Sequence, residues 1–224
     1  MPRNAANRGR MRCPRCWVRT EHCVCGDVRP FDTRTELVVV RHDAEVRKAT
    51  ATTRIAALAL PGLALVDYGD QPRLADEALA PLVAGEGTYL VYPGEPRAEW
   101  PETPPRRLVF LDATWRRTRR MARRLSSLAS LPRLWLPLKT EQVLRLRQSA
   151  LPEGRSTLEA VADALRLVGE TSAADGLSAL HELHAMRVLQ ARGVWPRPCD
   201  AWFTERHESP GRADPEPGAA SEHS

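Results

Sequence analysis

Short aliphatic or β-branched runs alternate with longer amphipathic segments from Glu36 onward. This alternation is typical of βα units arranged around a mostly parallel sheet. Strands are predicted at residues 37–40, 64–66, 88–92, 107–111 and 134–136. Helices are predicted at residues 44–60, 74–83, 115–128, 157–168 and 177–191, with Pro and Gly after the first and Gly193 after the last. The pattern therefore predicts an α/β fold with helices flanking the sheet.

The chain has room for one main domain, because its 224 residues suffice for a single α/β core with a small appendage. We expect an N-terminal segment at residues 1–30, the α/β domain at residues 31–204, and a disordered tail at residues 205–224 that is too poor in apolar residues to build a core. No apolar run approaches the ~20 residues that cross a bilayer. The basic start lacks the apolar stretch of a secretory signal. These features predict a cytoplasmic protein without a membrane segment.

Arginine is concentrated in two parts of the chain, although the formal net charge is only +5. Six arginines lie between Arg3 and Arg19 without an acid, and eight lie between Arg106 and Arg124 against the single acid Asp112. A planar guanidinium suits phosphate oxygens and base edges better than an ammonium group does. The pattern indicates a polyanionic partner such as RNA. An arginine-rich composition on solvated faces is the alternative.

The N-terminal segment holds four of the five cysteines, as Cys13-x-x-Cys16 and Cys23-x-Cys25. Disulfides are rare in a reducing cytosol, and four thiolates from two short knuckles match a tetrahedral, structural Zn²⁺ site. Zinc would then supply the folding energy of this segment and leave no coordination position open for catalysis. An iron–sulfur cluster and plain reduced thiols remain as alternatives. His22 could also replace one cysteine ligand.

A carboxylate ends the fourth predicted strand, in the sequence Asp-Ala-Thr-Trp at residues 112–115. Ligands of open α/β sheets bind at the carboxyl ends of the strands, so Asp112 is a candidate functional residue. The alternatives are a helix cap for Asp112 and a core position for Trp115. Further on, Ser156 and Glu159 predict a capping box at a helix start, and such an N-terminus can also bind an anion.

The order of several sequence blocks resembles the DTW-domain family of tRNA-uridine aminocarboxypropyltransferases. The resemblance covers residues 13–168 and rests on the cysteine cluster, His42-x-x-Glu45, Thr52-x-Arg54, Tyr92-Pro-Gly, Asp112-Ala-Thr-Trp115, Arg145-x-Arg147 and the block from Ser156 to Ala160. Ala51 and Thr53 depart from the pattern, because members often carry Asn and Gly at these positions. The resemblance implies a SPOUT-like fold with a C-terminal knot that forms the cofactor site.

The resemblance also implies an activity, transfer of the 3-amino-3-carboxypropyl group of S-adenosylmethionine to N3 of a uridine in a tRNA loop, with release of methylthioadenosine. The uridine must be splayed or flipped out, because pairing buries N3. Asp112, with Thr114 and Trp115, is the expected catalytic group, as base for the N3 proton or as clamp for the sulfonium. The expected cofactor-binding residues are His42, Glu45, Thr52, Arg54, Ser156, Thr157 and Glu159.

The helix predicted after Trp115 carries arginines on both sides of its apolar stripe, which gives a face suited to phosphates. The expected RNA-binding residues are Arg116, Arg117, Arg120, Arg124, Arg145 and Arg147. His42 and Glu45 have a simpler alternative as a polar pair at a helix start. Two other functions stay open, a methyltransferase that uses the same cofactor and a zinc-containing RNA-binding protein without enzymatic activity.

Overall fold

A single parallel sheet forms the centre of the computed structural model, which describes residues 11–93, 98–137, 144, 146 and 154–194. Its strands are β1 (Glu36–His42), β2 (Ala64–Tyr68), β3 (Thr88–Val91), β4 (Arg107–Asp112) and β5 (Arg133–Leu134). They lie in the order β2-β1-β4-β3-β5, and every neighbouring pair is parallel. The predicted α/β class with a parallel sheet is confirmed.

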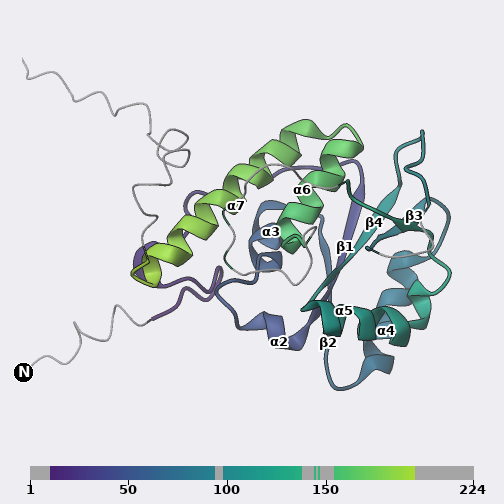
Figure 1. Ribbon diagram of the computed structural model, residues 1–224, viewed down its shortest axis with the longest axis horizontal. Coiled ribbons are helices and arrows are strands. Elements are labelled where there is room, and N and C mark those ends of the chain that lie inside the picture. Colours follow the sequence, from purple (N-terminus) through teal and green to yellow (C-terminus); the bar gives the residue numbers. More distant parts are fainter. Residues whose placement is uncertain (1–10, 94–97, 138–143, 145, 147–153, 195–224) are drawn as a thin grey trace, which may run out of the picture. The chain divides into compact units, whose positions relative to one another are not determined.

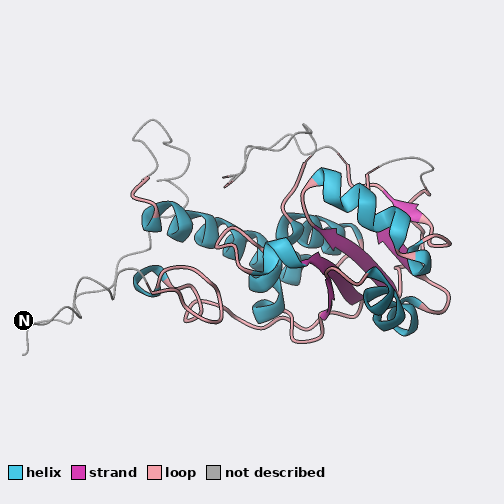
Figure 2. Cartoon of the chain, turned by 90° about the horizontal axis from the view of Figure 1, so that it is seen from below, coloured by secondary structure: helices cyan, strands magenta, loops and turns pink. Residues whose placement is uncertain are grey.

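Helices cover both faces of this sheet (Figures 1 and 2). One face carries α3 (Thr53–Ala59), α6 (Thr157–Leu167) and α7 (Thr171–Ala191). The other carries α4 (Pro72–Val83), α5 (Trp115–Arg124) and the 3-10 turn η2 (Ser126–Leu128). The short α2 (Asp43–Val46) follows β1, and the 3-10 turn η1 (Thr20–His22) belongs to the N-terminal segment. None of the helices in the described part of the chain is long and apolar enough to span a membrane.

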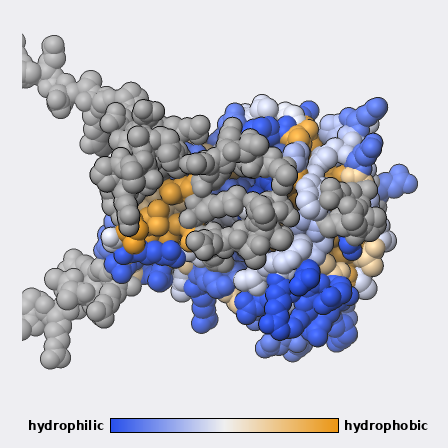
Figure 3. All heavy atoms as spheres, in the orientation of Figure 1, coloured by the Kyte–Doolittle hydropathy of each residue, from blue (hydrophilic) through white to orange (hydrophobic). Residues whose placement is uncertain are grey.

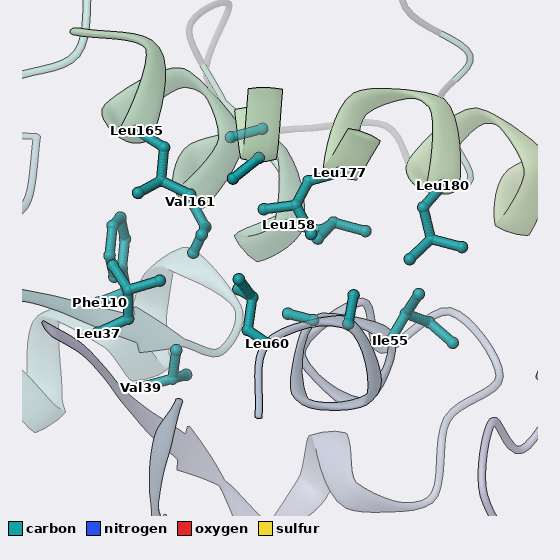
Figure 4. Packing of buried hydrophobic residues seen from close by; sticks show 14 of the residues in the cluster. Leu37, Val39, Ile55, Leu60, Phe110, Leu158, Val161, Leu165, Leu177 and Leu180 are labelled. Atoms are coloured by element: carbon teal, nitrogen blue, oxygen red, sulfur yellow. The ribbon is translucent and has the colours of Figure 1, made fainter. Parts of the chain in front are cut away.

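Both faces of the central strands are buried, which explains their unbroken hydrophobic runs. Leu37 and Phe110 pack against α6 (Figure 4), whereas Val38 and Val109 face α4 and α5. The N-terminal segment joins the first of these cores, because its fully buried Val18 and Val24 belong to the same cluster. The sheet thus holds the N-terminal segment and the helices α3, α6 and α7 on one side.

The helix predicted at residues 44–60 is wrong, because the chain leaves the helical path after α2 and resumes it at α3. The carbonyl of Ala49 in this interruption accepts a hydrogen bond from Nε2 of His184 on α7 at 2.9 Å. Threonines here also direct side chains into contacts with other elements, which competes with helix formation. The apolar periodicity could not show this break, since Ile55 and Ala56 are buried in the expected way.

The helix predicted at residues 115–128 is also too long, because α5 ends at Arg124 and the chain turns into η2. The carboxylate of Asp76 on α4 accepts hydrogen bonds from the backbone N–H groups of Ser126 and Ser127, each at 3.0 Å. Leu125 and Leu128 remain buried, so the apolar spacing continued past the real helix end. At the other boundaries, α7 begins at Thr171 instead of 177, and β5 covers Arg133–Leu134 instead of 134–136.

Some predictions concern residues outside the described part of the chain. They include Arg145, Arg147, the tail at residues 205–224, and part of the path on which the predicted C-terminal knot depends.

Candidate active site and cysteine centre

Asp112 ends β4, the middle strand of the sheet, and its side chain is buried. Thr157 Oγ1 donates a hydrogen bond to Asp112 Oδ1 at 2.8 Å, and Thr53 Oγ1 donates to Oδ2 at 2.5 Å. The N-cap of the following helix α5 is Thr114 instead of Asp112. The carboxylate is therefore held by two threonines from other elements, and it does not occupy the cap position of its own helix.

Two helix starts converge on this carboxylate. Thr53 is the first residue of α3 and Thr157 the first residue of α6, and the two starts are joined where Leu158 N–H donates to Thr52 Oγ1 at 3.2 Å. The positive end of a helix dipole stabilises a nearby anion. The capping box predicted for Ser156 and Glu159 is confirmed, with both reciprocal hydrogen bonds present.

A cavity of about 400 Å³ lies beside Asp112 at the carboxyl ends of the strands. Pockets of this size commonly hold small-molecule ligands. The predicted site residues in its lining are Glu45, Thr52, Asp112, Thr114, Trp115, Ser156, Thr157 and Glu159. Thr50, Tyr92, Thr118, Trp135, Arg155 and His181 also line it and were not predicted as site residues. The cavity thus brings together blocks that lie far apart in the sequence.

Three carboxylates line this cavity while being buried in the protein, namely Glu45, Asp112 and Glu159. Glu45 is 1% exposed and pairs with Lys48 at 2.5 Å. The lining also contains a cation, Arg155, whose Nε donates a hydrogen bond to Asp163 Oδ2 at 2.7 Å. Several carboxylates in one wall give this part of the cavity a negative potential, which suits a ligand that carries positive charge.

An aromatic pair forms another part of the lining. The rings of Tyr92 and Trp115 stack with centroids 5.6 Å apart and an interplanar angle of 22°. Arg119 lies over the Trp115 ring at 5.9 Å, and Arg133 lies over the Tyr92 ring at 5.4 Å. Burial raises the pKa of the Tyr92 hydroxyl despite these nearby guanidinium groups. Trp115 is half-buried and lines the cavity, so it is not a plain core residue.

The arginines of α5 form a cationic surface next to this cavity. Thr118 and Met121 face inward, whereas Arg116, Arg119, Arg120, Arg123 and Arg124 are exposed and Arg117 is half-buried. Figure 3 shows strongly hydrophilic residues gathered where α5 lies. None of these arginines forms an ion pair with an acid in the described part of the chain. Their charges are therefore available to a polyanion.

Two residues predicted to bind the cofactor lie away from the cavity lining. His42 caps α2, with its Nδ1 accepting from Ala44 N–H at 3.1 Å and its ring 5.7 Å from that of Tyr68. Arg54 instead contacts the cysteine segment, and its guanidinium lies 5.6 Å from the centre of the Trp17 ring. For His42, this placement matches the simpler alternative of a polar residue at a helix start.

Thr53, Arg155 and His181 contact Asp112 or line the cavity but were not predicted as site residues. Thr53 stands next to the predicted Thr52 at a helix start, which is a usable signal for a side chain that faces a strand end. Arg155 directly precedes the predicted capping box, but nothing in its neighbourhood pointed to the cavity. His181 lies inside a long helix without a local motif, and only the packing of α7 on α6 brings it to the cavity wall.

The four cysteines predicted to bind metal lie together. The Sγ atoms of Cys13 and Cys25 and those of Cys16 and Cys23 are each 3.7 Å apart, and all four lie within 4.8 Å of one another. A tetrahedron with metal–sulfur bonds of ~2.3 Å has edges of about 3.8 Å, so the arrangement fits a tetrahedral Cys₄ site. Four sulfur ligands are typical of zinc and of iron–sulfur sites.

The backbone of the first knuckle supports this arrangement. Cys13 exchanges backbone hydrogen bonds with Trp17 and Val18, each at 2.8 Å, and Trp17 takes the left-handed conformation with a φ of 63°. Burial raises the pKa of Cys13, but hydrogen bonds from the backbone of Cys16 and Arg15 outweigh it and lower the pKa to about 7. The turn thus stabilises a thiolate at Cys13, whereas burial raises the pKa of the Cys23 and Cys25 thiols.

Arg54 ties the cysteine segment to the α/β core. Its Nη1 donates to the carbonyls of Pro14 at 3.2 Å and Arg15 at 3.3 Å, and its Nη2 donates to the carbonyl of Val46 at 2.5 Å. Burial and the charge of Arg41 lower the pKa of this guanidinium. Arg54 follows Thr53 on α3, so adjacent residues contact the cysteine segment and Asp112.

The strand-end cavity, the motif at residues 112–115 and the N-terminal cysteine centre define the class of the protein. The chain belongs to the DTW domain family, whose model matches residues 10–190. It is 30% identical over 175 residues to tRNA-uridine aminocarboxypropyltransferase 2 from Mus musculus, an alignment that covers 71% of this chain and 57% of the relative. The chain thus spans less than two thirds of that relative. No solved structure matches the chain.

Proposed function

We propose that the protein transfers the 3-amino-3-carboxypropyl group of S-adenosylmethionine to N3 of a uridine in an accessible tRNA loop and releases methylthioadenosine. Membership of the DTW family and the name of the mouse relative support this reaction. The observation that carries it is the buried Asp112 carboxylate, fixed by Thr53 and Thr157 in the wall of a ligand-sized cavity beside the α5 arginines.

The charges of the cavity suit this co-substrate. S-adenosylmethionine carries a sulfonium and an ammonium group against one carboxylate, and three buried carboxylates line the cavity. Arg155, which lines the cavity, would bind the carboxylate of the methionine moiety while it keeps its contact with Asp163. The stacked rings of Tyr92 and Trp115 offer a surface for a planar base. The residues thus fit a cationic ligand that contains an aromatic ring.

Asp112 acts in this proposal as a fixed negative charge that orients the sulfonium. Each of its oxygens already accepts a hydrogen bond from a threonine hydroxyl, so the carboxylate is held in one orientation. Transfer of the aminocarboxypropyl group instead of the methyl group depends on which carbon attached to sulfur faces the uridine. A rigid counter-charge sets that orientation. Of the two roles open for Asp112, binding the sulfonium is therefore favoured over accepting the N3 proton.

The α5 arginines and the four cysteines have separate roles in this proposal. The exposed α5 arginines would bind tRNA phosphates near the cavity mouth. Zinc is proposed at Cys13, Cys16, Cys23 and Cys25, where four protein ligands leave no position for a reacting group. The metal would hold the N-terminal segment against α3 through the Arg54 contacts.

The reaction is tested by nucleoside mass spectrometry of unmodified tRNA incubated with the protein and S-adenosylmethionine. We expect aminocarboxypropyl-uridine together with methylthioadenosine. Asp112→Asn should lower the rate by about 10²-fold or more, because the sulfonium loses its counter-charge. Methylated uridine with S-adenosylhomocysteine would instead mean a methyltransferase. Tight tRNA binding without consumption of S-adenosylmethionine would mean a non-enzymatic RNA-binding protein.

A matched pair of variants separates the geometry of Asp112 from its charge. Thr53→Ser keeps the hydroxyl that donates to Asp112 and should stay near the wild-type rate, whereas Thr53→Ala should lose rate. Equal rates for both variants would mean that the Thr53 contact does not position Asp112. The affinity for S-adenosylmethionine, measured by calorimetry, shows whether the loss arises in binding or in the chemical step.

A further inference from the structure

A histidine and a glutamate face each other across one wall of the cavity. His181 on α7 is 3% exposed, and its Nε2 lies 3.6 Å from Oε2 of Glu159 on α6. Both residues line the cavity. We propose that His181 is the catalytic base that takes the N3 proton of the uridine, with Glu159 as its positioning residue. This inference rests on the aminocarboxypropyl transfer proposed above.

The reaction needs a proton acceptor, and Asp112 is poorly suited to this role. Uridine N3 carries a proton that must leave as the new N–C bond forms, and both oxygens of Asp112 already accept hydrogen bonds from threonines. Imidazole is the side chain best suited to accept a proton near neutral pH. Among the described residues that line the cavity, His181 is the one with an imidazole.

Glu159 is arranged to support a positive charge on the imidazole. Its Oε2 accepts the backbone N–H of Ser156 at 2.8 Å, which fixes the carboxylate at the start of α6. Its Oε1 is buried and makes no hydrogen bond within the described residues. A carboxylate beside a catalytic histidine orients the ring and stabilises the imidazolium that forms. The 3.6 Å separation is longer than a hydrogen bond and lies within the range of an ion pair with a protonated ring.

The step balances without another reactant. The electron pair of the N3–H bond forms the bond between N3 and the carbon attached to sulfur, and that carbon–sulfur bond breaks with its electron pair on sulfur. Methylthioadenosine leaves as a neutral thioether, and the proton moves from N3 to His181. Water takes the proton from the imidazolium after the products leave.

Several charged groups surround this pair, and they determine how the rate depends on pH. Glu159 and Arg155 approach from the α6 side, Glu45 with its partner Lys48 from α2, Asp112 from β4, and His184 from α7 itself. Burial and the charge of His181 lower the pKa of His184 to about 4. His184 donates to the Ala49 carbonyl and does not line the cavity. It is therefore a matched control for His181.

The test compares His181→Gln with His184→Gln in the full-length protein under single-turnover conditions. Glutamine can keep a donor near the position of Nε2 but cannot take up a proton, so His181→Gln should lose about 10²-fold or more in rate. S-adenosylmethionine affinity should change little. The wild-type rate should fall at acid pH as His181 becomes protonated, and this fall should disappear in His181→Gln. His184→Gln should keep the acid fall of the wild-type pH profile, because its side chain does not line the cavity and glutamine can still donate to the Ala49 carbonyl.

Glu159→Gln gives an independent measurement in case His181→Gln does not fold. Glutamine also completes a capping box, so the start of α6 is preserved while the charge beside His181 is lost. We expect a slower enzyme in which the acid fall of the rate moves to lower pH. A wild-type rate and profile in His181→Gln, or an unmoved profile in Glu159→Gln, overturns the role of His181. If wild-type protein makes no aminocarboxypropyl-uridine, the proposed function itself fails.

Discussion

The cysteine centre and the Asp112 cavity are assembled in opposite ways. Four sulfur atoms of the centre come from residues 13–25, one short segment. Asp112 receives its hydrogen bonds from residues 59 positions before it and 45 positions after it in the sequence. A metal can therefore organise the first site locally, whereas the second exists only when the sheet and the starts of α3 and α6 are in place.

The two sites are nevertheless linked through consecutive residues of α3. Thr53 donates to Asp112, and Arg54 donates to the carbonyls of Pro14 and Arg15 in the first cysteine knuckle. A helix start that is held on both sides transmits a displacement of the knuckle to the carboxylate. The difference in assembly thus predicts an asymmetry, in which loss of metal disturbs the cavity but changes inside the cavity leave the metal bound.

The largest effect on folding should come from Cys16→Ser, which removes a proposed zinc ligand that is 1% exposed. Binding of structural zinc in peptides is worth about 10–16 kcal/mol, so its loss should unfold the segment around residues 11–25. Metal analysis should find one zinc in the wild type and none in Cys16→Ser, with new tryptic cleavage at the arginines of that segment. Cys199→Ser is the control, because Cys199 is far from the Cys13–Cys25 segment in the sequence.

Other results of the metal analysis would change the comparison. Visible absorption with bound iron would indicate an iron–sulfur cluster. Full activity of metal-free wild-type protein would mean that the protein does not need a metal. Asp112→Asn should keep its zinc. A loss of zinc from that variant would contradict the expected asymmetry between the two sites.

A smaller effect is expected for Arg54→Ala, which removes the link but neither site. The loss of its hydrogen bonds to three carbonyls should lower the free energy of unfolding by about 1–3 kcal/mol. Zinc should stay bound but pass faster to a chelator, and the transfer rate should fall because the start of α3 is no longer held.

The control for Arg54 is Arg47→Ala, since Arg47 forms no side-chain hydrogen bond or ion pair within the described residues. Chelation kinetics and calorimetric unfolding measure both variants side by side. If zinc leaves Arg54→Ala at the wild-type rate, Arg54 does not couple the cysteine segment to α3.

The same contrast explains which parts of the protein could be predicted from its sequence. The cysteine cluster, the capping box and the carboxylate at the end of β4 are local patterns, and each was found. His181 was missed because only the packing of α7 against α6 brings it to the cavity wall. Arg54 was assigned to the cofactor because its block resembles a family motif, whereas its side chain contacts the knuckle carbonyls.

Two predicted helix boundaries were wrong for a related reason. Apolar periodicity continued through the interruption before α3 and past the end of α5, because buried residues lie on both sides of each break. The breaks depend on distant polar partners, the His184 contact with Ala49 and the Asp76 contacts with Ser126 and Ser127. Such partners are not visible in a window of sequence. In the first case, the break also supplies residues of the cavity wall, Thr50, Ala51 and Thr52.

The double variant Arg120→Ala and Arg124→Ala should have the smallest effect on folding. It should selectively weaken the binding of tRNA. Both side chains are exposed on α5 and belong to neither site, so zinc content, stability and S-adenosylmethionine affinity should not change. Each lost phosphate contact should reduce the slope of log Kd against log salt by about 0.7–0.9. Arg73→Ala, which removes an exposed arginine paired with Glu77 on α4, should leave this slope unchanged. An equal slope in the double variant and the wild type would place the tRNA on another surface, while the cysteine centre and the Asp112 cavity would keep their proposed roles.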